Sequence, residues 1–311
     1  MTETLNGLSV VMPNYNGEAL LAENLPPLIK ALQSWGGVWE IIVVDDASRD
    51  TSVALLRSAF PDVLLLCNET NLGFSATCNR GMQMAKYRLA LCINTDVLVE
   101  DDFVAPLLEH FNDPSLFAVT PNIIAAREGK NQGIVHGIFS KGFLKGGFGS
   151  LEERSPAREN LYAVGACVVY DLNKFKALGG YAELYAPYLF EDVDISYRAW
   201  KRGWKSMYDP RSTVHHFSSA TISAEGKRRK RIIYFRNRFL FHWVNLTDPA
   251  MVAMHCVYVG VRLLTSFLWG DFAYYHSFGA AVTRRREVIA LRKKESLYRL
   301  LNDRNILRRT V

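Results

Sequence analysis

Three polar stretches in the first hundred residues follow apolar runs that read as buried strands. The stretches and their runs are Pro13 to Asn16 after 8–12, Asp45 and Asp46 after 40–44, and Asn94 to Asp96 after 89–93. A carboxylate at the tip of a buried strand is costly to desolvate unless a cation or a hydrogen-bond donor meets it. Mg²⁺ and Mn²⁺ bind carboxylate oxygens together with waters and phosphate oxygens. We therefore expect Asp96 to help bind a divalent cation and a phosphate-bearing ligand.

The sequence lacks the glycine-rich loops that usually bind phosphate through backbone N–H groups. There is no G-x-G-x-x-G after the first predicted strand and no G-x-x-x-x-G-K-[ST] anywhere. A diphosphate bound without such a loop needs a divalent cation or the side chains of Arg and Lys. The motif content therefore favours a metal-assisted diphosphate site over a dinucleotide or P-loop site.

A second group of carboxylates, Glu191, Asp192 and Asp194, begins a helix predicted over 191–204. Crowded negative charges raise the pKa of at least one carboxyl group, which suits a group that accepts a proton. An Asp at a helix start is also a common N-cap, so both roles stay open for Asp192. Asp194 is two residues further along and points away from Asp192, and we expect a structural role for it.

The order of the predicted elements indicates an α/β fold. Through residue 125, strands at 8–12, 40–44, 62–66 and 89–93 alternate with helices at 18–35, 50–60 and 75–87. Strands that are apolar throughout are covered on both faces, as in a parallel sheet flanked by helices. The right-handed crossover rule then gives a doubly wound sheet with ligands at the carboxyl ends of its strands. Residues 126–160 are rich in glycine and charge and predict a mobile loop or insertion, and a strand at 162–171 follows.

The net charge of +6 conceals an asymmetry along the 311 residues. Residues 226–311 hold eighteen Lys and Arg against five Asp and Glu, a net +13, whereas residues 1–225 carry −7. We expect a catalytic domain over 1–225 and a basic helical appendage over 226–311 that meets phosphate on a substrate, a nucleic acid or a lipid surface. The five cysteines form no C-x-x-C pair, and no signal-peptide pattern opens the chain, which favours reduced thiols in the cytoplasm.

Several stretches together resemble the family 2 inverting glycosyltransferases, which have the GT-A fold. In family order, and over roughly residues 8 to 241, they are VVMPNYNG, IIVVDDASRDTS, NLGFSATCNRG, INTD, GACVVYDLNKFKALGGYAE, YLFEDVDISYRAWKRGW, VHHFSSAT and YFRNRFL. The tryptophan-rich helix is similar to the bacterial rhamnosyl- and galactofuranosyl-transferase-like branch. The resemblance implies transfer of a sugar from a nucleotide diphosphate to an acceptor hydroxyl, with inversion at the anomeric carbon.

The resemblance also implies a donor site. Pro13 and Tyr15 would lie against the nucleotide base, and Asp46 would accept a hydrogen bond from a ring N–H, which favours uracil or thymine and hence UDP- or dTDP-sugars. The other residues that it places at the donor are Asn16, Asn71, Gly73, Asn79, Asp96 and Arg236.

The metal and the base follow from the same resemblance. Asp96 matches the last residue of the family's D-x-D metal motif, although the first Asp is Asn94 here. His216 occupies the histidine position that helps to bind the metal or the diphosphate, so Asp96 and His216 would bind Mg²⁺ or Mn²⁺. Asp192 matches the general base, with Glu191 as the second candidate. Arg236 and Arg238 would reach the diphosphate or an anionic acceptor, unless they form only a solvated helix face.

The segment 248–275 is apolar but carries His255, Tyr258, Arg262 and Ser266 at three- and four-residue steps. This stripe predicts an amphipathic helix that lies in a membrane surface or packs in a homo-oligomer, rather than one that spans the bilayer. The basic residues of 283–294 would bind anionic lipids. We therefore expect attachment to the cytoplasmic membrane face, where lipid-linked glycan acceptors would be, and no nucleic-acid partner.

Two other functions compete with this prediction. A nucleotidyltransferase shares an Asp-rich α/β core, but needs a glycine-rich basic loop near the first strand, which MPNYNGEALL lacks. A non-catalytic module could bind a nucleotide-sugar or a polyanion through the basic region. It would have no recognisable nucleic-acid reader motif, and the acidic body would repel a polyanion.

Overall fold

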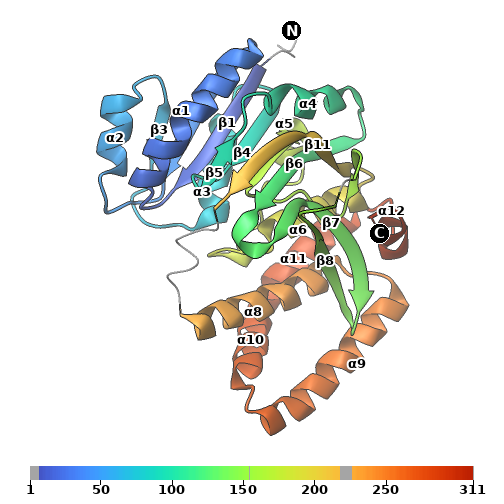
Figure 1. Cartoon of the computed structure of the whole chain (residues 1–311). Coiled ribbons are helices and arrows are strands. Elements are labelled where there is room, and N and C mark those ends of the chain that lie inside the picture. Colours follow the sequence, from blue (N-terminus) through green and yellow to red (C-terminus); the bar gives the residue numbers. More distant parts are fainter. Residues whose placement is uncertain (1–6, 154, 218–225, 311) are drawn as a thin grey trace.

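The structure is a computed structural model that describes residues 7–153, 155–217 and 226–310. Within these residues, one large sheet has the strand order β3-β2-β1-β4-β10-β6-β11-β5 (Figure 1). The strands on this path are β1 Gly7–Asn14, β2 Val38–Asp45, β3 Leu64–Cys67, β4 Leu89–Ile93, β5 Val97–Val99, β6 Leu116–Ala125, β10 Cys167–Asp171 and β11 Lys205–His216. The pairs within β3-β2-β1-β4 and the pair β6–β11 are parallel, whereas β10 and β5 run antiparallel to their neighbours. The predicted α/β sheet is confirmed, and it is mixed, since four of the seven pairs along this path are parallel.

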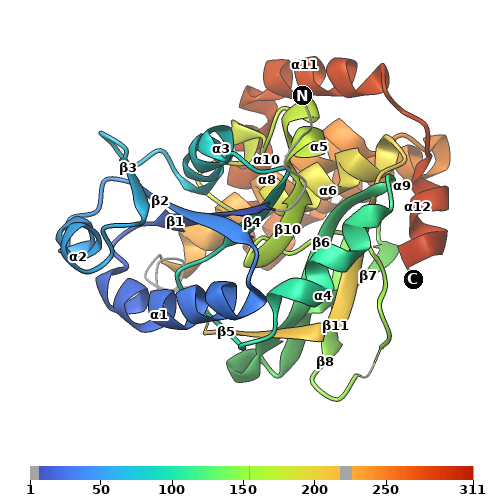
Figure 2. The same cartoon turned by 90° about the horizontal axis from the view of Figure 1, so that it is seen from above.

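Helices cover both faces of the sheet, as Figure 2 shows from above. On one face lie α1 Glu18–Trp35 and α4 Val104–Glu109, and α2 Ser52–Ala59 packs beside α1; on the other lie α3 Phe74–Met84, α5 Leu172–Ala177 and α6 Glu191–Lys201. Side chains of β1 alternate between the two layers. Val10 joins the core beneath α1, and Val11 joins the core beneath α3. This double burial explains why the strands are apolar without alternation.

The described residues of 126–160 form an inserted β-hairpin with a third short strand, so of the two predicted alternatives the insertion agrees with the structure and the mobile loop was wrong. Strands β7 Lys130–Ser140 and β8 Phe143–Ser150 pair antiparallel, and β9 Arg158–Asn160 pairs with β11. Lys141 and Gly142 both have positive φ, as in the favoured two-residue hairpin turn. Glycines along the strands permit close packing: a Cβ on Gly146 would lie 2.5 Å from the Tyr162 ring. These glycines hide the strand pattern in the sequence.

The remaining helices belong to the C-terminal region. They are α8 Lys227–Asn245, α9 Pro249–Thr265, α10 Phe272–Thr283, α11 Arg285–Ser296 and α12 Asp303–Thr310. Two of them pack back onto the first region through buried ion pairs, Arg202 with Glu295 at 2.9 Å and Lys201 with Asp303 at 2.8 Å. Arg292 donates to the carbonyls of Trp243 and Leu246. Arg292 is thus a C-terminal cation that stabilises the fold, and its contacts are made with the protein backbone.

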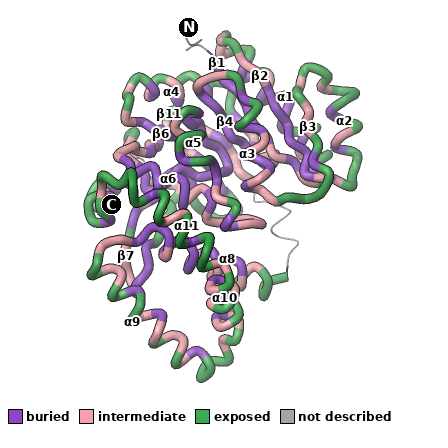
Figure 3. Tube along the Cα trace, turned by 180° about the vertical axis from the view of Figure 1, so that it is seen from behind, coloured by how far each residue is buried: buried purple, intermediate pink, exposed green. Residues whose placement is uncertain are grey.

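Helix α9 departs from the fold's usual burial pattern. Its predicted polar stripe faces the protein: His255 and Ser266 are buried, and Arg262 pairs with Asp271 at 3.0 Å. The opposite, exposed side is apolar, and Figure 3 colours most of the helix as exposed or intermediate. By length and composition, Pro249–Trp269 is apolar enough to cross a membrane, with a mean hydropathy of 1.6.

Candidate active site

A cavity of about 370 Å³ opens where the predicted polar strand ends meet. Its lining is Pro13, Asn14, Tyr15, Asn16, Leu20, Asp46, Asn71, Gly73, Phe74, Thr77, Asn94, Thr95, Asp96, Pro187, Tyr188 and Arg229. Seven of the nine predicted donor-binding residues are in this set. The convergence follows from the parallel strands β1, β2 and β4, which bring their carboxyl ends to one edge of the sheet.

Asp46 is almost saturated by its own chain. Its carboxylate accepts hydrogen bonds from Asn68 Nδ2 at 2.7 Å, Leu72 N at 2.8 Å and Gly73 N at 2.9 Å. A carboxylate has about four acceptor positions, so one is left for a further donor. Asp46 can thus shape the loop at 68–73 and still accept one N–H from a ligand.

Gly73 joins this loop to the segment before α6. Its φ is +83°, and a Cβ at this position would lie 3.0 Å from the Pro187 carbonyl oxygen. Phe74 N donates to that same oxygen at 3.1 Å. At Gly73 the two backbone segments thus approach closely, which brings the loop at 68–73 against the segment before α6.

Asn16 links the first two strand ends. Its side-chain oxygen accepts from Arg49 N at 2.7 Å, and its N–H donates to Ser48 Oγ at 2.8 Å. It has a positive φ of 51°, which asparagine tolerates well. This bracing leaves the neighbouring Tyr15 ring half-buried in the cavity wall.

Asn79 and Arg236 do not line the cavity. Both amide atoms of Asn79 bond the backbone of Tyr181 at 2.9 Å. Arg236 donates to the carbonyls of Tyr185 and Ala186. The structure places both residues as supports of loops beside the cavity.

Asp96 and His216 face each other across the β5–β11 pair. His216 Nε2 lies 3.4 Å from Asp96 Oδ1. Gln132 on β7 accepts from His216 Nδ1 at 2.8 Å and donates through Nε2 to Glu128 Oε2 at 3.1 Å. This chain fixes the Gln132 amide and makes Nδ1 of His216 the donor, so Nε2 is the ring nitrogen that faces Asp96, and it is free to bind a cation when it carries no proton.

These atoms fit a divalent cation. Asp96 Oδ2, His216 Nε2 and Asn94 Oδ1 are all buried and have no hydrogen-bond partner among the described residues. Three electron-rich atoms without donors are what a hard cation binds. In the part of the chain that the structure describes, no three His, Cys, Asp or Glu side chains cluster to bind a metal, so the other ligands would be phosphate and water oxygens. His215 faces away and pairs with Glu100.

Two backbone contacts hold the loop at 94–96 in place. Asn24 Nδ2 on α1 donates to the Thr95 carbonyl at 2.7 Å. Asn94 N donates to the Ala166 carbonyl at 2.9 Å. Asn24 is a buried amide in an otherwise apolar helix face, and that is the signal by which the sequence could have revealed it.

The predicted base lies close to the same segment. Asp192 Oδ2 accepts from Gly165 N at 3.0 Å, one residue before Ala166, and Asp192 Oδ1 accepts from Val193 N at 2.8 Å. Each oxygen keeps a position for a further hydrogen bond. Through Gly165 and Ala166 the base and the metal loop are joined to one stretch of backbone, although Asp192 itself is not part of the cavity lining.

Burial determines which of Glu191 and Asp192 keeps its proton. Burial raises the pKa of Glu191 to about 8, and the charge of Asp192 adds to this shift. Burial also raises the pKa of Asp192, against hydrogen bonds from Gly165 and Val193. Glu191 Oε2 has no hydrogen-bond partner among the described residues. The expected repulsion is therefore relieved by keeping the buried Glu191 protonated, which leaves Asp192 as the group that can carry the charge.

Asp194 is structural, as predicted. It accepts from Tyr185 Oη at 2.8 Å, Arg198 Nε at 2.6 Å and Asn245 Nδ2 at 2.7 Å. The side chains of Tyr181, Tyr185 and Trp200 are each at most 1% exposed. They are therefore core residues, and none of them offers a stacking face to a sugar.

Asn237 is a site residue that the sequence analysis missed. Its Nδ2 lies 2.7, 2.9 and 2.8 Å from the carbonyls of Tyr185, Tyr188 and Leu189. Leu189 and Phe190 have φ of 72° and 80°, values that L residues rarely adopt. Asn237 therefore holds a strained turn that sets the start of α6. Asn237 lies between the two arginines of YFRNRFL, and as a neutral amide it gives no sequence signal of a functional role.

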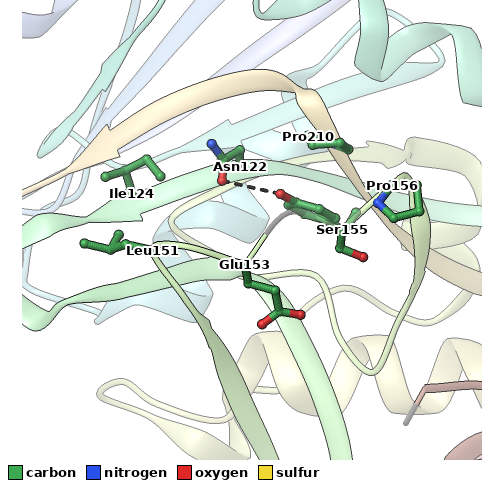
Figure 4. Close-up of a pocket in the computed structure, with 8 residues that line it drawn as sticks. Asn122, Ile124, Leu151, Glu153, Ser155, Pro156 and Pro210 are labelled. Carbon is green, nitrogen blue, oxygen red and sulfur yellow. Dashed lines mark hydrogen bonds between the residues drawn. The ribbon is translucent and has the colours of Figure 1, made fainter.

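A second cavity of about 630 Å³ lies beside β6 and β11 (Figure 4). Its carboxylate, Glu153, pairs with His136 at 3.0 Å, and Tyr208 Oη donates to Asn122. None of the predicted site residues lines it, so we place the active site at the smaller cavity.

A family model described as "Glycosyl transferase family 2" matches residues 9–179, more than half of the chain. This chain belongs to glycosyl transferase family 2. The poly-beta-1,6-N-acetyl-D-glucosamine synthase of Staphylococcus aureus (strain COL) is 22% identical over 232 residues, which cover 74% of this chain and 54% of that protein. The synthase of Staphylococcus epidermidis matches to the same extent. The chain spans about half the length of these curated relatives.

Solved structures agree on the GT-A fold. S. aureus TarS 1-349 in complex with UDP-GlcNAc gives a TM-score of 0.59 at 15% identity, over 97% of this chain and 89% of that one. GalNAc-T7 with UDP, GalNAc and Mn²⁺ gives 0.57 at 19% identity, over 82% and 55%. The family 2 assignment replaces the nucleotidyltransferase alternative, whereas the rhamnosyl- or galactofuranosyl-transferase-like branch stays a prediction.

Substituting Gln132→Ala should weaken Mn²⁺ binding by about tenfold to a hundredfold, because the imidazole of His216 loses the partner that fixes its tautomer and orientation. Free Mn²⁺ can be measured by electron paramagnetic resonance in the presence of inorganic pyrophosphate. Gln33→Ala, on the exposed side of α1, is the matched control. An unchanged Mn²⁺ affinity in the Gln132 variant would contradict the proposed ligand geometry.

Glu191 should make the folded state less stable as pH rises from 5 to 8. The unfolded chain releases this proton near pH 4.5, whereas the folded chain keeps it to about pH 8, so each pH unit between them costs up to about 1.4 kcal/mol. Glu191→Gln removes the titrating carboxyl group, so the difference in unfolding free energy between wild type and variant should change between pH 5 and 8. Equal slopes in urea titrations at pH 5, 6.5 and 8 would show that Glu191 ionises normally.

Proposed function

We propose that this chain transfers a sugar from a UDP- or dTDP-linked donor to a hydroxyl of a glycan or lipid-linked glycan, with inversion at the anomeric carbon. The observation that carries the proposal is the pair of unpartnered atoms, Asp96 Oδ2 and His216 Nε2, at the rim where the nucleotide-sized cavity ends. A cation bound there meets a diphosphate in that cavity. The non-catalytic binding module remains the alternative, and activity separates the two.

The donor base is inferred from the cavity's contacts. Asp46 has one acceptor position left, which suits the single ring N–H of uracil or thymine. Tyr15 offers a ring face for stacking in the same cavity. The solved TarS and GalNAc-T7 structures contain UDP or UDP-GlcNAc, which supports a uridine donor for the family member described here.

The transfer step is a direct displacement. The acceptor hydroxyl attacks the anomeric carbon, its O–H proton passes to a carboxylate oxygen of Asp192, and the bond from that carbon to the diphosphate oxygen breaks with its electron pair on the diphosphate. Protonated Glu191 beside it limits the negative charge near the leaving group. Asn237 stabilises the strained turn at 189–190 and thereby fixes the orientation of Asp192.

Asp96 and His216 would hold Mg²⁺ or Mn²⁺, with Asn94 Oδ1 as a further oxygen. When bound, the cation supplies Lewis-acid stabilisation of the charge that grows on the departing diphosphate. Mn²⁺ in the GalNAc-T7 structure supports a divalent ion. The missing first Asp of the motif is offset here by the histidine whose Nε2 faces Asp96.

We also propose that the chain binds the cytoplasmic membrane face through the outer side of α9. Large apolar side chains recur there at three- and four-residue steps, at Met254, Val257, Val261, Leu264 and Leu268. Trp269 follows and is 81% exposed. A contiguous apolar stripe with a tryptophan at its end suits a bilayer interface. The polysaccharide synthases among the relatives support a role at the cell envelope.

Asp192→Asn should lower the hydrolysis of UDP-GlcNAc or dTDP-rhamnose with Mn²⁺ by about 10³-fold, since the amide cannot take the proton. Thermal stabilisation by UDP with Mn²⁺ should persist in this variant, and Asp62→Asn on an exposed loop should leave both readings unchanged. Full activity of Asp192→Asn would rule out this base. Nucleotide binding with no hydrolysis or transfer in the wild type would favour the binding module.

The double substitution Leu264→Glu and Trp269→Glu should abolish flotation with vesicles of phosphatidylcholine and phosphatidylglycerol, because both side chains leave the apolar stripe. Leu297→Glu is the matched control, since Leu297 is 77% exposed, compared with 75% for Leu264, and lies outside α9. Failure of the wild type to float at low salt would contradict membrane attachment. A concentration-dependent dimer that the double variant loses would assign the stripe to a second copy instead.

A further inference from the structure

A group of three cations lies between the β7–β8 hairpin and α8, and we call it the hairpin cation cluster: Lys141, Lys145 and Arg238. The guanidinium carbon of Arg238 is 3.9 Å from the Phe143 ring centroid. Lys145 Nζ donates to Ser140 Oγ at 2.9 Å. Lys145 lies on the surface, and partial desolvation followed by the charges of Arg238 and Lys141 lowers its pKa, which agrees with the three cations lying near one another on the hairpin and α8.

No carboxylate neutralises this cluster within the described chain. Neither Arg238 nor the two lysines has an ion pair there, and burial lowers the pKa of Arg238. The nearby Asp271 already pairs with Arg231 at 2.8 Å and Arg262 at 3.0 Å. Cations gathered on one wall without a carboxylate leave their charge and donors available to an anionic ligand.

Tyr274 adds a neutral donor beside Arg238. Its side chain is 2% exposed, and its hydroxyl has no hydrogen-bond partner among the described residues. Burial raises the pKa of Tyr274 to about 12, while Arg262 and Arg238 act in the opposite direction. The hydroxyl therefore stays protonated and can donate to the same anion as Arg238.

The cluster is connected to the catalytic carboxylates by a short row of aromatic rings. Tyr234, one helical turn before Arg238, has its ring centroid 5.6 Å from that of Phe190, which precedes Glu191. Burial, then Asp192, then Tyr234 raise the pKa of Tyr162, so that ring lies near both. Gly146, next to Lys145, packs against the Tyr162 ring. An extended molecule along this wall can thus reach both the cations and Asp192.

The hairpin that carries the two lysines of the cluster contacts the proposed membrane helix. His255 Nδ1 on α9 donates to the Gly142 carbonyl at 2.8 Å, at the hairpin turn beside Lys141. The exposed apolar stripe of α9 starts at the neighbouring Met254. One lipid phosphate could therefore place its hydrocarbon chain in the bilayer beside α9 and its phosphate group at the three cations.

We propose that the hairpin cation cluster binds the phosphate of the acceptor, and that the acceptor is a phosphate-linked lipid saccharide. This inference rests on the proposed function and narrows its acceptor to one chemical class. A phosphate on a bulk phospholipid is the other source of the same chemistry. The row of rings between the cluster and Asp192 favours the acceptor as the source of the phosphate, because the headgroup of a bulk phospholipid does not have to reach Asp192.

Farnesyl diphosphate is the probe, since it carries a lipid chain and phosphate without a sugar. Its binding to the full chain is measured by calorimetry in EDTA, which keeps the probe from the metal site, with farnesol as the neutral control. Arg238→Gln should weaken binding about tenfold and Lys145→Ala should weaken it several-fold, because each loses a charge-assisted contact. Lys130→Ala, at the other end of the hairpin, should bind as the wild type does.

Three results would overturn the proposal. They are unchanged affinity in both cluster variants, equal affinity for farnesol, and full competition by phosphatidylglycerol vesicles, which would assign the cluster to bulk lipid. Lys145 is exposed, so its variant tests the cluster even if Arg238→Gln does not fold. Stabilisation by UDP with Mn²⁺ is recorded in the same samples. If it is present while farnesyl diphosphate does not bind, only the acceptor inference fails; if it is absent, the proposed donor function fails.

Discussion

The close approach of Asp96 and His216 is the constraint around which the site is arranged. Asp96 Oδ1 and His216 Nε2 are 3.4 Å apart, and this contact is favourable only when positive charge, either a bound cation or a proton on Nε2, lies at the pair. Asp96 is 4% exposed and His216 Nε2 is buried, so bulk water does not take the place of that charge. The antiparallel pairing of β5 with β11 creates this juxtaposition, and β7 supplies the residue that fixes the tautomer.

Three other carboxyl groups around the site each have their own compensating contact. Asp46 accepts three hydrogen bonds from the loop at 68–73. Glu191 stays protonated because it is buried beside Asp192. Asp194 is neutralised by Arg198 in the core. A diphosphate carries several negative charges, so a site that binds one tolerates few free carboxylates, and each of these is accounted for by a different contact.

The C-terminal region takes part in the site rather than standing apart from it. Asn237 on α8 holds the strained turn before α6, and Asn245 on the same helix bonds Asp194. Removing α8 would therefore release the loop that orients Asp192. The region combines this scaffold role with an outward apolar face on α9, and so it connects the carboxylates of α6 with the exposed stripe.

The sequence by itself determined the doubly wound sheet, the strand-end cavity and the family, because apolar runs and short polar motifs are local signals that report burial and chemistry directly. It also pointed to Asp96, His216 and Asp192. It misjudged residues 126–160, since glycines needed for close packing erased the strand pattern, and it placed Asn79 and Arg236 at the donor. Only the tertiary structure decided the roles of Gln132, Asn24 and Asn237. These are neutral amides whose function lies entirely in which distant backbone or side chain they meet, and no local pattern encodes a contact between residues far apart in the chain.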